Sequence, residues 1–293
     1  MQVIENTQFR AEINEKGAEL THLINKAGNF DYIWNNDLWP KHAPVLFPAI
    51  GRSEKDSYLL NGQEYQMPQH GFAGDQLFDV TANSGQSLTL SLTDNTATKK
   101  LFPFKFRLDV TFTVTETGIK LNFDVNNLDD QTLAFSIGSH PAFNVPIDGD
   151  ATFDDYQLEF QPKNLDLKQF EIIKTPAPYR DGKIIPLTAA DKSTIQLNHD
   201  MFEAGLVIIE NDGINSVKLS SQKSDHSIEL SLNDFRYVCL WTKEGANAPF
   251  LCIEPFQGLP DISGQESELL EKEANVTLDA GKQASYGYEM TLN

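Results

Sequence analysis

The chain has 293 residues, of which 40% are hydrophobic and 22% charged, an ordinary composition for a folded protein with a sizeable core. The 42 Asp and Glu residues exceed the 23 Lys and Arg residues, so the formal net charge is -19. This charge repels nucleic acids and anionic membranes at long range and leaves neutral small molecules unaffected, so we expect no nucleic-acid and no membrane partner.

Alternation of apolar and polar residues predicts antiparallel strands from the first third of the chain onward. "SLTLSLT" at 87–93 puts leucines on one face and small polar residues on the other. "FRLDVTFTVT" at 106–115 and "IKLNFDVNN" at 119–127 repeat this pattern on either side of Gly118, which predicts a β-hairpin. Further strand patterns occur at 216–221, 227–232 and 248–256.

Helical patterns are few and short. The best candidate is "ESELLEKEA" at 266–274, and "HDMFEA" at 199–204 is typical of a single turn. Proline or glycine occurs in nearly every segment between the predicted strands, which is typical of turns. No linker is long enough to divide the chain into domains. We therefore predict an all-β fold, one large antiparallel sandwich domain with few short helices that covers residues 1–293.

Sequence signals of location and cofactors are negative. The first residues lack a basic segment followed by an apolar one, and no apolar run reaches the about 18 residues of a membrane span, so we expect a cytoplasmic protein. Cys239 and Cys252 lie in hydrophobic segments, which favours reduced core thiols; a disulfide is the alternative. Nucleotide-binding fingerprints, zinc-protease motifs and nucleophile elbows do not occur in the sequence, so we expect neither a metal nor another cofactor.

Three residues stand out as candidates for chemistry. His140, in "GSHPAFNVP", precedes a proline that favours extended backbone, so we place it at a strand end. Glu254, in "FLCIEPFQGLPD", interrupts an apolar segment; at the wet end of a buried strand, partial burial raises a carboxyl pKa toward that of a general base. His70, in "MPQHGFAGD", has the setting of a ligand-binding loop. A structural role remains open for each of the three.

Four motifs together resemble the aldose 1-epimerase (galactose mutarotase-like) family, and most closely its LacX-like branch. They are "LFPAIGR" around Arg52, "QHGFA" around His70, "GSHPAFNVP" around His140, and "WTKEGANAPFLCIEPFQGLPD" around Glu254. The resemblance implies a large antiparallel β-supersandwich with an open sugar cleft. It also implies His140 as general acid, Glu254 as general base, and Arg52 and His70 as ligands of the sugar hydroxyls.

The resemblance implies further contacts to the sugar. Asp200, in "LNHDMF", takes the place of the family's additional sugar-binding aspartate, although its spacing to Phe202 differs. Trp241 either stacks on the apolar face of the pyranose or packs in the core. Asn144 either orients a neighbouring group in the site through its amide or has a purely structural role. Two departures bear on which sugar fits: Gly74 stands where the branch usually has arginine, and Phe256 where it usually has tryptophan.

The expected reaction is interconversion of the α- and β-anomers of a hexose such as glucose or galactose. One group takes the C1 hydroxyl proton while another protonates the ring oxygen, and we expect His140 and Glu254 on opposite sides of the sugar. Three alternatives stay open. One is a non-catalytic sugar-binding protein. Another is a hexose-6-phosphate mutarotase whose phosphate meets Lys41 and Arg52. The third is a glycosidase with a second carboxylate about 5–10 Å from Glu254. We expect a monomer or homodimer.

Overall fold

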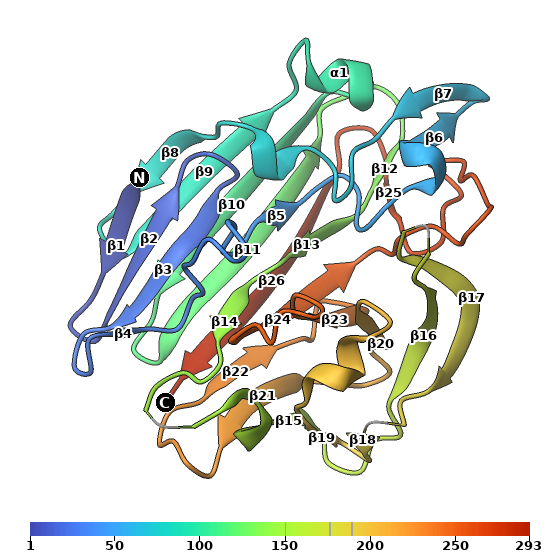
Figure 1. Ribbon diagram of the computed structural model, residues 1–293. Helices are drawn as coiled ribbons and strands as arrows, with labels where there is room; N and C mark the ends of the chain where they lie inside the picture. The colour runs from blue at the N-terminus through green and yellow to red at the C-terminus, as the bar shows by residue number, and fades with distance from the viewer. Residues whose placement is uncertain (150, 176, 189) are drawn as a thin grey trace.

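Two large antiparallel sheets dominate the computed structural model (Figure 1), which describes residues 1–149, 151–175, 177–188 and 190–293. Within these ranges the larger sheet has ten strands. In spatial order they are β18 (Ala190–Asp191), β19 (Thr194–Gln196), β15 (Tyr156–Gln161), β21 (Ser216–Ser221), β22 (Ile228–Ser231), β26 (Gln283–Leu292), β11 (Gly118–Asn127), β10 (Phe106–Val114), β9 (Ser87–Thr93) and β8 (Asp79–Asn83).

The second sheet has eight strands among the described residues. Seven follow one another in the order β17 (Tyr179–Pro186), β16 (Lys168–Ile173), β20 (Val207–Glu210), β23 (Tyr237–Trp241), β24 (Phe250–Gln257), β13 (Ile137–Ser139) and β5 (Val45–Leu46). The eighth, β14 (Ala142–Asn144), also pairs with β24. The edge of β24 is therefore shared between β13 and β14, which leaves a short gap between them.

Smaller elements flank the two large sheets (Figure 1). A four-stranded sheet consists of β1 (Gln2–Glu5), β2 (Phe9–Asn14), β3 (Glu19–Asn25) and β4 (Phe30–Asp31), and its strands β1 and β2 lie beside β10 of the larger sheet. Two strand pairs are β6 (Ser57–Leu60) with β7 (Gln63–Gln66), and β12 (Leu133–Phe135) with β25 (Val276–Leu278). The helices described are α1 (Thr98–Leu101) and the 3-10 turns η1 (Glu54–Asp56), η2 (Ala73–Asp75), η3 (Phe153–Asp155) and η4 (His199–Phe202). In the described parts of the chain we find no helix of the length and apolarity that spanning a bilayer requires.

The all-β prediction is confirmed, and the hairpin predicted around Gly118 forms, with Val110 opposite Phe123 and Phe112 opposite Leu121. The helix predicted at 266–274 is wrong. Its backbone instead pairs with the edge of β6: Leu59 N–H donates to Ser267 O, and Leu269 N–H donates to Leu59 O. These tertiary bonds satisfy the groups that a helix would have paired internally.

The core between the sheets explains how the candidate loops are held. Phe47, just after β5, packs against the rings of Phe72, Phe102, Phe106 and Phe135 at centroid distances of 5.2–6.2 Å. Its carbonyl accepts hydrogen bonds from the N–H groups of Phe72 and Ala73. The "LFPAIGR" and "QHGFA" segments are thereby fixed to each other and to the core.

The eight-stranded sheet is buried on both faces near its centre. Alternate residues of β23 and β24 point into the main core: Val238, Leu240, Leu251 and Ile253. The residues between them lie on the outer face, in two smaller apolar clusters. One contains Tyr237, Cys239 and Phe256, and the other contains Phe250 and Cys252 with Trp241 packed against it. Because side chains alternate along a strand, Glu254 lies on this outer face as well.

Candidate functional site

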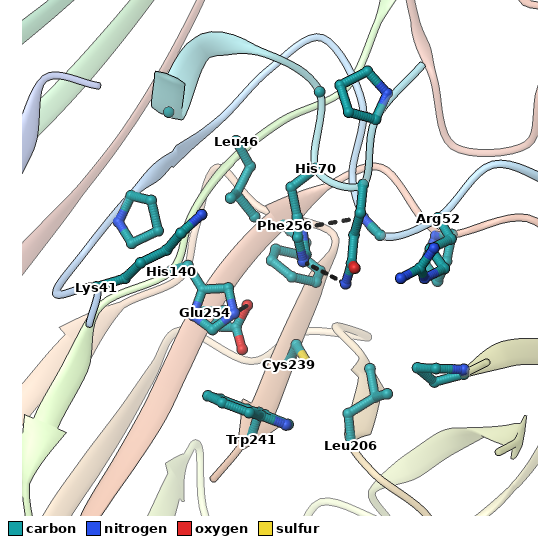
Figure 2. Close-up of a pocket in the computed structure, with 18 of the residues that line it drawn as sticks. Lys41, Leu46, Arg52, His70, His140, Leu206, Cys239, Trp241, Glu254 and Phe256 are labelled. Atoms are coloured by element: carbon teal, nitrogen blue, oxygen red, sulfur yellow. Dashed lines mark hydrogen bonds and ion pairs between the residues drawn. The ribbon is translucent and has the colours of Figure 1, made fainter. Parts of the chain in front are cut away.

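A cavity of about 500 Å³ opens over the outer face of the eight-stranded sheet. Strands β5, β20, β23 and β24 contribute to its lining, and loops around residues 39–44, 51–52 and 68–75 contribute further residues. Five of the seven residues predicted from the sequence line this cavity (Figure 2): Arg52, His70, His140, Trp241 and Glu254. They come from segments far apart in the chain, so the fold brings them together.

Glu254 is more deeply buried than the sequence suggested. It sits in the middle of β24, opposite Cys239 of β23, and only 1% of its surface is exposed. The expected position at the wet end of a strand is therefore wrong. Pro255 does not end the strand, because the gap between β13 and β14 lies beside this part of β24 and leaves the ladder there incomplete.

His140 occupies that gap. Gly138 of β13 pairs with Phe256 and Ala142 of β14 pairs with Cys252, so the residue midway between them faces Glu254. The expected strand-end position is confirmed, since β13 ends at Ser139. The His140 N–H donates to Pro44 O over 3.0 Å, which fixes the backbone and aims the ring at β24.

The two candidate acid–base residues touch. The distance from His140 Nε2 to Glu254 Oε2 is 3.3 Å (Figure 2). His140 Nδ1 and Glu254 Oε2 are both buried and have no hydrogen-bond partner among the described residues. The two groups therefore lie side by side at the cavity, whereas the sequence predicted them on opposite sides of a bound sugar.

Burial sets the electrostatics of the pair. It raises the pKa of the Glu254 carboxyl well above its ordinary range, and the nearby Cys239 thiol offsets only part of this shift. Burial also lowers the pKa of His140 well below 6.5, and the neighbouring His70 and Lys41 side chains act on it in the same direction. Both shifts disfavour the ionic arrangement of the pair, in which Glu254 is a carboxylate and His140 an imidazolium.

His70 is held in a defined tautomer by Gly51. The Gly51 N–H donates to His70 Nδ1 over 3.2 Å, so in the neutral ring Nε2 carries the proton. Burial, with Lys41 and Arg52 adding, lowers the pKa of His70 to about 4, and the ring is therefore neutral at pH 7. The next residue must be glycine: Gly71 has φ +75°, and a Cβ there would lie 2.2 Å from Phe47 O.

Arg52 is positioned through the loop that follows β24. Its carbonyl accepts a hydrogen bond from Asp261 N–H, and the Asp261 carboxylate accepts from Glu54 N–H and pairs with Lys272 over 2.7 Å. Arg52 Nη1 contacts Asp56 Oδ1 at 3.1 Å, while its buried Nε has no partner among the residues described. The guanidinium therefore retains donor capacity at the cavity.

Indole rings form one wall of the cavity. Trp241 lies 5.7 Å from the His140 ring and Trp39 lies 5.1 Å from it, with 5.4 Å between the two indoles. Both line the cavity and are partly exposed. Sequence reasoning missed Trp39; its place directly before Pro40, in the same loop as Lys41, was the available signal.

Two residues predicted to contact the sugar, Asp200 and Asn144, do not line the cavity. Asp200 is exposed on η4, and it is not among the residues that line the cavity. Asn144 in β14 uses its amide to donate to Asp31 O and Ile33 O, so it ties β14 to the segment after β3. The geometry therefore supports the structural role for Asn144.

The pair and a neighbouring thiol form a group of metal-binding residues. It contains one ligand atom from each of His140, Cys252 and Glu254, and these atoms lie within 4.8 Å of one another. Both cysteines are free and buried, as the sequence predicted, and burial raises the pKa of each thiol well above its ordinary value.

Solved structures share this fold over its whole length. A galactose mutarotase-like protein from Lactobacillus casei ATCC 334 is 41% identical, with a TM-score of 0.95 and coverage of 100% of both chains. A galactose mutarotase related enzyme from Lactobacillus acidophilus is 30% identical, with a TM-score of 0.92 over 100% of this chain and 97% of the other. The fold is thus a galactose mutarotase-like β-sandwich.

Sequence comparison agrees with the structural one. The chain is 27% identical over 306 residues to the plasmid-encoded protein LacX of Lactococcus lactis subsp. lactis, which covers 99% of this chain and 98% of that protein. The family described as aldose 1-epimerase matches residues 1–277. The chain belongs to the aldose 1-epimerase family, and its relatives support the LacX-like branch.

Proposed function

We propose that this protein is a mutarotase, an aldose 1-epimerase that interconverts the α- and β-anomers of a hexose such as glucose or galactose. The observation that carries the proposal is the contact between His140 and Glu254 in a cavity of about 500 Å³ with an indole wall. A protein that only bound sugar would gain nothing from two buried titratable groups that share one proton.

Adjacent groups suit this reaction because both reacting oxygens are bonded to C1. Starting from a Glu254 carboxylate and a His140 imidazolium, the carboxylate takes the proton of the C1 hydroxyl. The imidazolium gives its proton to the ring oxygen, the bond between C1 and the ring oxygen breaks, and a carbonyl forms. The pair is then neutral, with the proton on Glu254.

Ring closure reverses these transfers after rotation about the C1–C2 bond. The C5 hydroxyl loses its proton to His140 and attacks the other face of C1, while Glu254 returns a proton to the former carbonyl oxygen. The pair passes through its ionic and its neutral arrangements once per turnover. Burial narrows the gap in free energy between them, because it penalises the ionic arrangement.

The remaining residues orient the sugar in this proposal. His70 Nε2–H and the Arg52 guanidinium donate hydrogen bonds to hydroxyl or ring oxygens, and Trp241 and Trp39 cover an apolar face of the pyranose. Asp200 and Asn144 have no part in it. The functional unit is one sugar-binding domain formed by residues 1–293, with a small-molecule sugar as its partner.

Polarimetry tests the proposal. Freshly dissolved α-glucose and α-galactose relax to anomeric equilibrium, and EDTA-treated protein at catalytic concentration is expected to accelerate this relaxation. Reducing ends released from oligosaccharides are measured in parallel, and their release would favour a glycosidase. If the relaxation rates of common aldoses are unchanged, the mutarotase proposal is wrong for these sugars.

One observation favours a phosphorylated hexose as a second candidate substrate. Lys41 and Arg52 line the same cavity, and both lower the pKa of His70, so a local positive potential opposes the net charge of -19 (Figure 2). We keep the neutral sugar as the leading candidate because of that net charge and the glycine at position 74. A clearly higher kcat/KM for glucose 6-phosphate than for glucose at matched ionic strength would reverse this order.

A further inference from the structure

We propose that the acid–base pair, with the Cys252 thiolate, forms an inhibitory site for Zn²⁺ or a similar thiophilic cation. The ion is an inhibitor in this proposal and takes no part in turnover. It would bind His140, Glu254 and Cys252, three neighbours around the gap between β13 and β14.

The separations suit a tetrahedral ion. Two nitrogen or oxygen ligands about 2.0–2.1 Å from Zn²⁺ are about 3.3–3.4 Å apart in a regular tetrahedron. His140 Nε2 and Glu254 Oε2 are 3.3 Å apart before any ion is added. A sulfur ligand belongs about 3.6 Å from each of them. The three ligand atoms already lie within 4.8 Å of one another, so Cys252 Sγ has to close by about 1 Å at most.

A second observation points to a ligand. Glu254 Oε2 is buried on a side chain that is 1% exposed, and although it lies 3.3 Å from His140 Nε2, no well-aligned hydrogen bond from the described residues reaches it. The lone pairs of this oxygen are therefore incompletely used, and a cation supplies the missing interaction. The mixed nitrogen, oxygen and sulfur set favours Zn²⁺ over Mg²⁺, which prefers oxygen ligands and an octahedral arrangement.

Access and charge also permit binding. His140 and Glu254 line the cavity, so an ion reaches them by the same route as the sugar, while Cys252 is buried beside them. Binding releases the Cys252 thiol proton and the proton shared by the pair to solvent, so a dication is held by two anionic ligands and one neutral ligand. The lone pairs that would move protons during mutarotation are then engaged, so zinc and sugar compete.

The first test measures binding without reference to catalysis. EDTA-treated protein is dialysed against Zn²⁺, and a second sample receives Co²⁺. One ion per chain and a thiolate-to-cobalt charge-transfer absorption are expected. Cys252→Ser should abolish that absorption. Cys239→Ser is the matched control, because Cys239 lies on the same sheet face beside Glu254 but outside the three-donor set, and it should retain the absorption.

The second test measures inhibition and rests on the proposed function. Each variant's rate is normalised to its own metal-free rate. Cys252→Ser should raise the Zn²⁺ concentration for half-inhibition by about tenfold or more, and Mg²⁺ should have no effect. Because the cobalt spectrum does not depend on turnover, failure of the mutarotase proposal is distinguishable from failure of this one.

Two results would overturn the zinc site: no cobalt–thiolate absorption in the wild-type protein, or equal zinc inhibition in wild type and Cys252→Ser. If Cys252→Ser does not fold, His140→Asn replaces it. A cobalt affinity at least about tenfold weaker than wild type would then support the site, and an unchanged affinity would refute it.

Discussion

Replacing Glu254 with glutamine isolates the proposed base with little change of shape. The side chain is 1% exposed, and its carboxyl group is near the Cys239 thiol and has Oε2 3.3 Å from His140 Nε2. Glutamine has nearly the same shape and volume, so the packing around it is retained. We expect the free energy of unfolding to change by no more than about 1.5 kcal/mol, the net value of one hydrogen bond. The amide cannot accept the C1 hydroxyl proton, and kcat should fall by about 10²–10⁴-fold, or about 3–5 kcal/mol in barrier height.

The assay is polarimetric relaxation of α-galactose, with sugar affinity measured separately by calorimetry and folding by thermal unfolding. Glu244→Gln is the matched control, because Glu244 lines the same cavity but is exposed and pairs with Lys174 at its edge. It should lose far less activity. A folded Glu254→Gln protein with near wild-type kcat would refute the reasoning, since the buried carboxylate would then have no part in proton transfer.

Three further predictions concern the surrounding groups. Activity should show a bell-shaped dependence on pH, because the His140–Glu254 pair takes up a second proton in acid and loses its last proton in alkali. His140→Asn should lower kcat by about 10²-fold or more and remove this bell-shaped profile. An unchanged profile would show that another residue is the acid. The free energy of unfolding should fall by up to about 1.4 kcal/mol per pH unit as pH drops from 6.5 toward about 4, because the pKa of His70 is lowered to about 4 and the unfolded chain binds its proton first. His70→Asn should flatten that slope in chemical denaturation, and an equal slope in both proteins would contradict the lowered pKa of the half-buried ring. Trp241→Ala should raise KM roughly tenfold, about 1.4 kcal/mol, with a smaller change in kcat, and an unaltered KM would remove the indole from the sugar site.

Local patterns explain which parts of the fold were predictable. The strands at 87–93 and 106–127 alternate cleanly, and a short turn fixes the register of the hairpin, so no distant information was needed. The segment at 266–274 has a helical pattern of similar quality. It fails because β6, about two hundred residues earlier, supplies its hydrogen bonds. The tertiary hydrogen bonds outweighed the local helix propensity. Only the local propensity can be judged from the sequence.

The candidate site was predictable in its membership and not in its geometry. The prolines after His140 and after Glu254 drew attention to these two residues, but their contact depends on how β13 and β14 divide the edge of β24. No local pattern encodes that register across more than one hundred residues. The same holds for Trp39, whose ring reaches the cavity only after its loop folds back. Asp200 was assigned from the motif "LNHDMF", although its spacing to Phe202 differs from the family pattern, and η4 leaves it exposed.

Exchange between anomers at equilibrium gives the most direct test of the central claim that a shared-proton pair opens the sugar ring. Selective inversion of one anomeric proton signal of galactose or glucose reports the exchange rate by NMR without any coupling enzyme. EDTA-treated wild-type protein should transfer inversion between the two anomers, and folded His140→Asn and Glu254→Gln proteins should each lose that transfer. Transfer that persists undiminished in both variants would contradict the account.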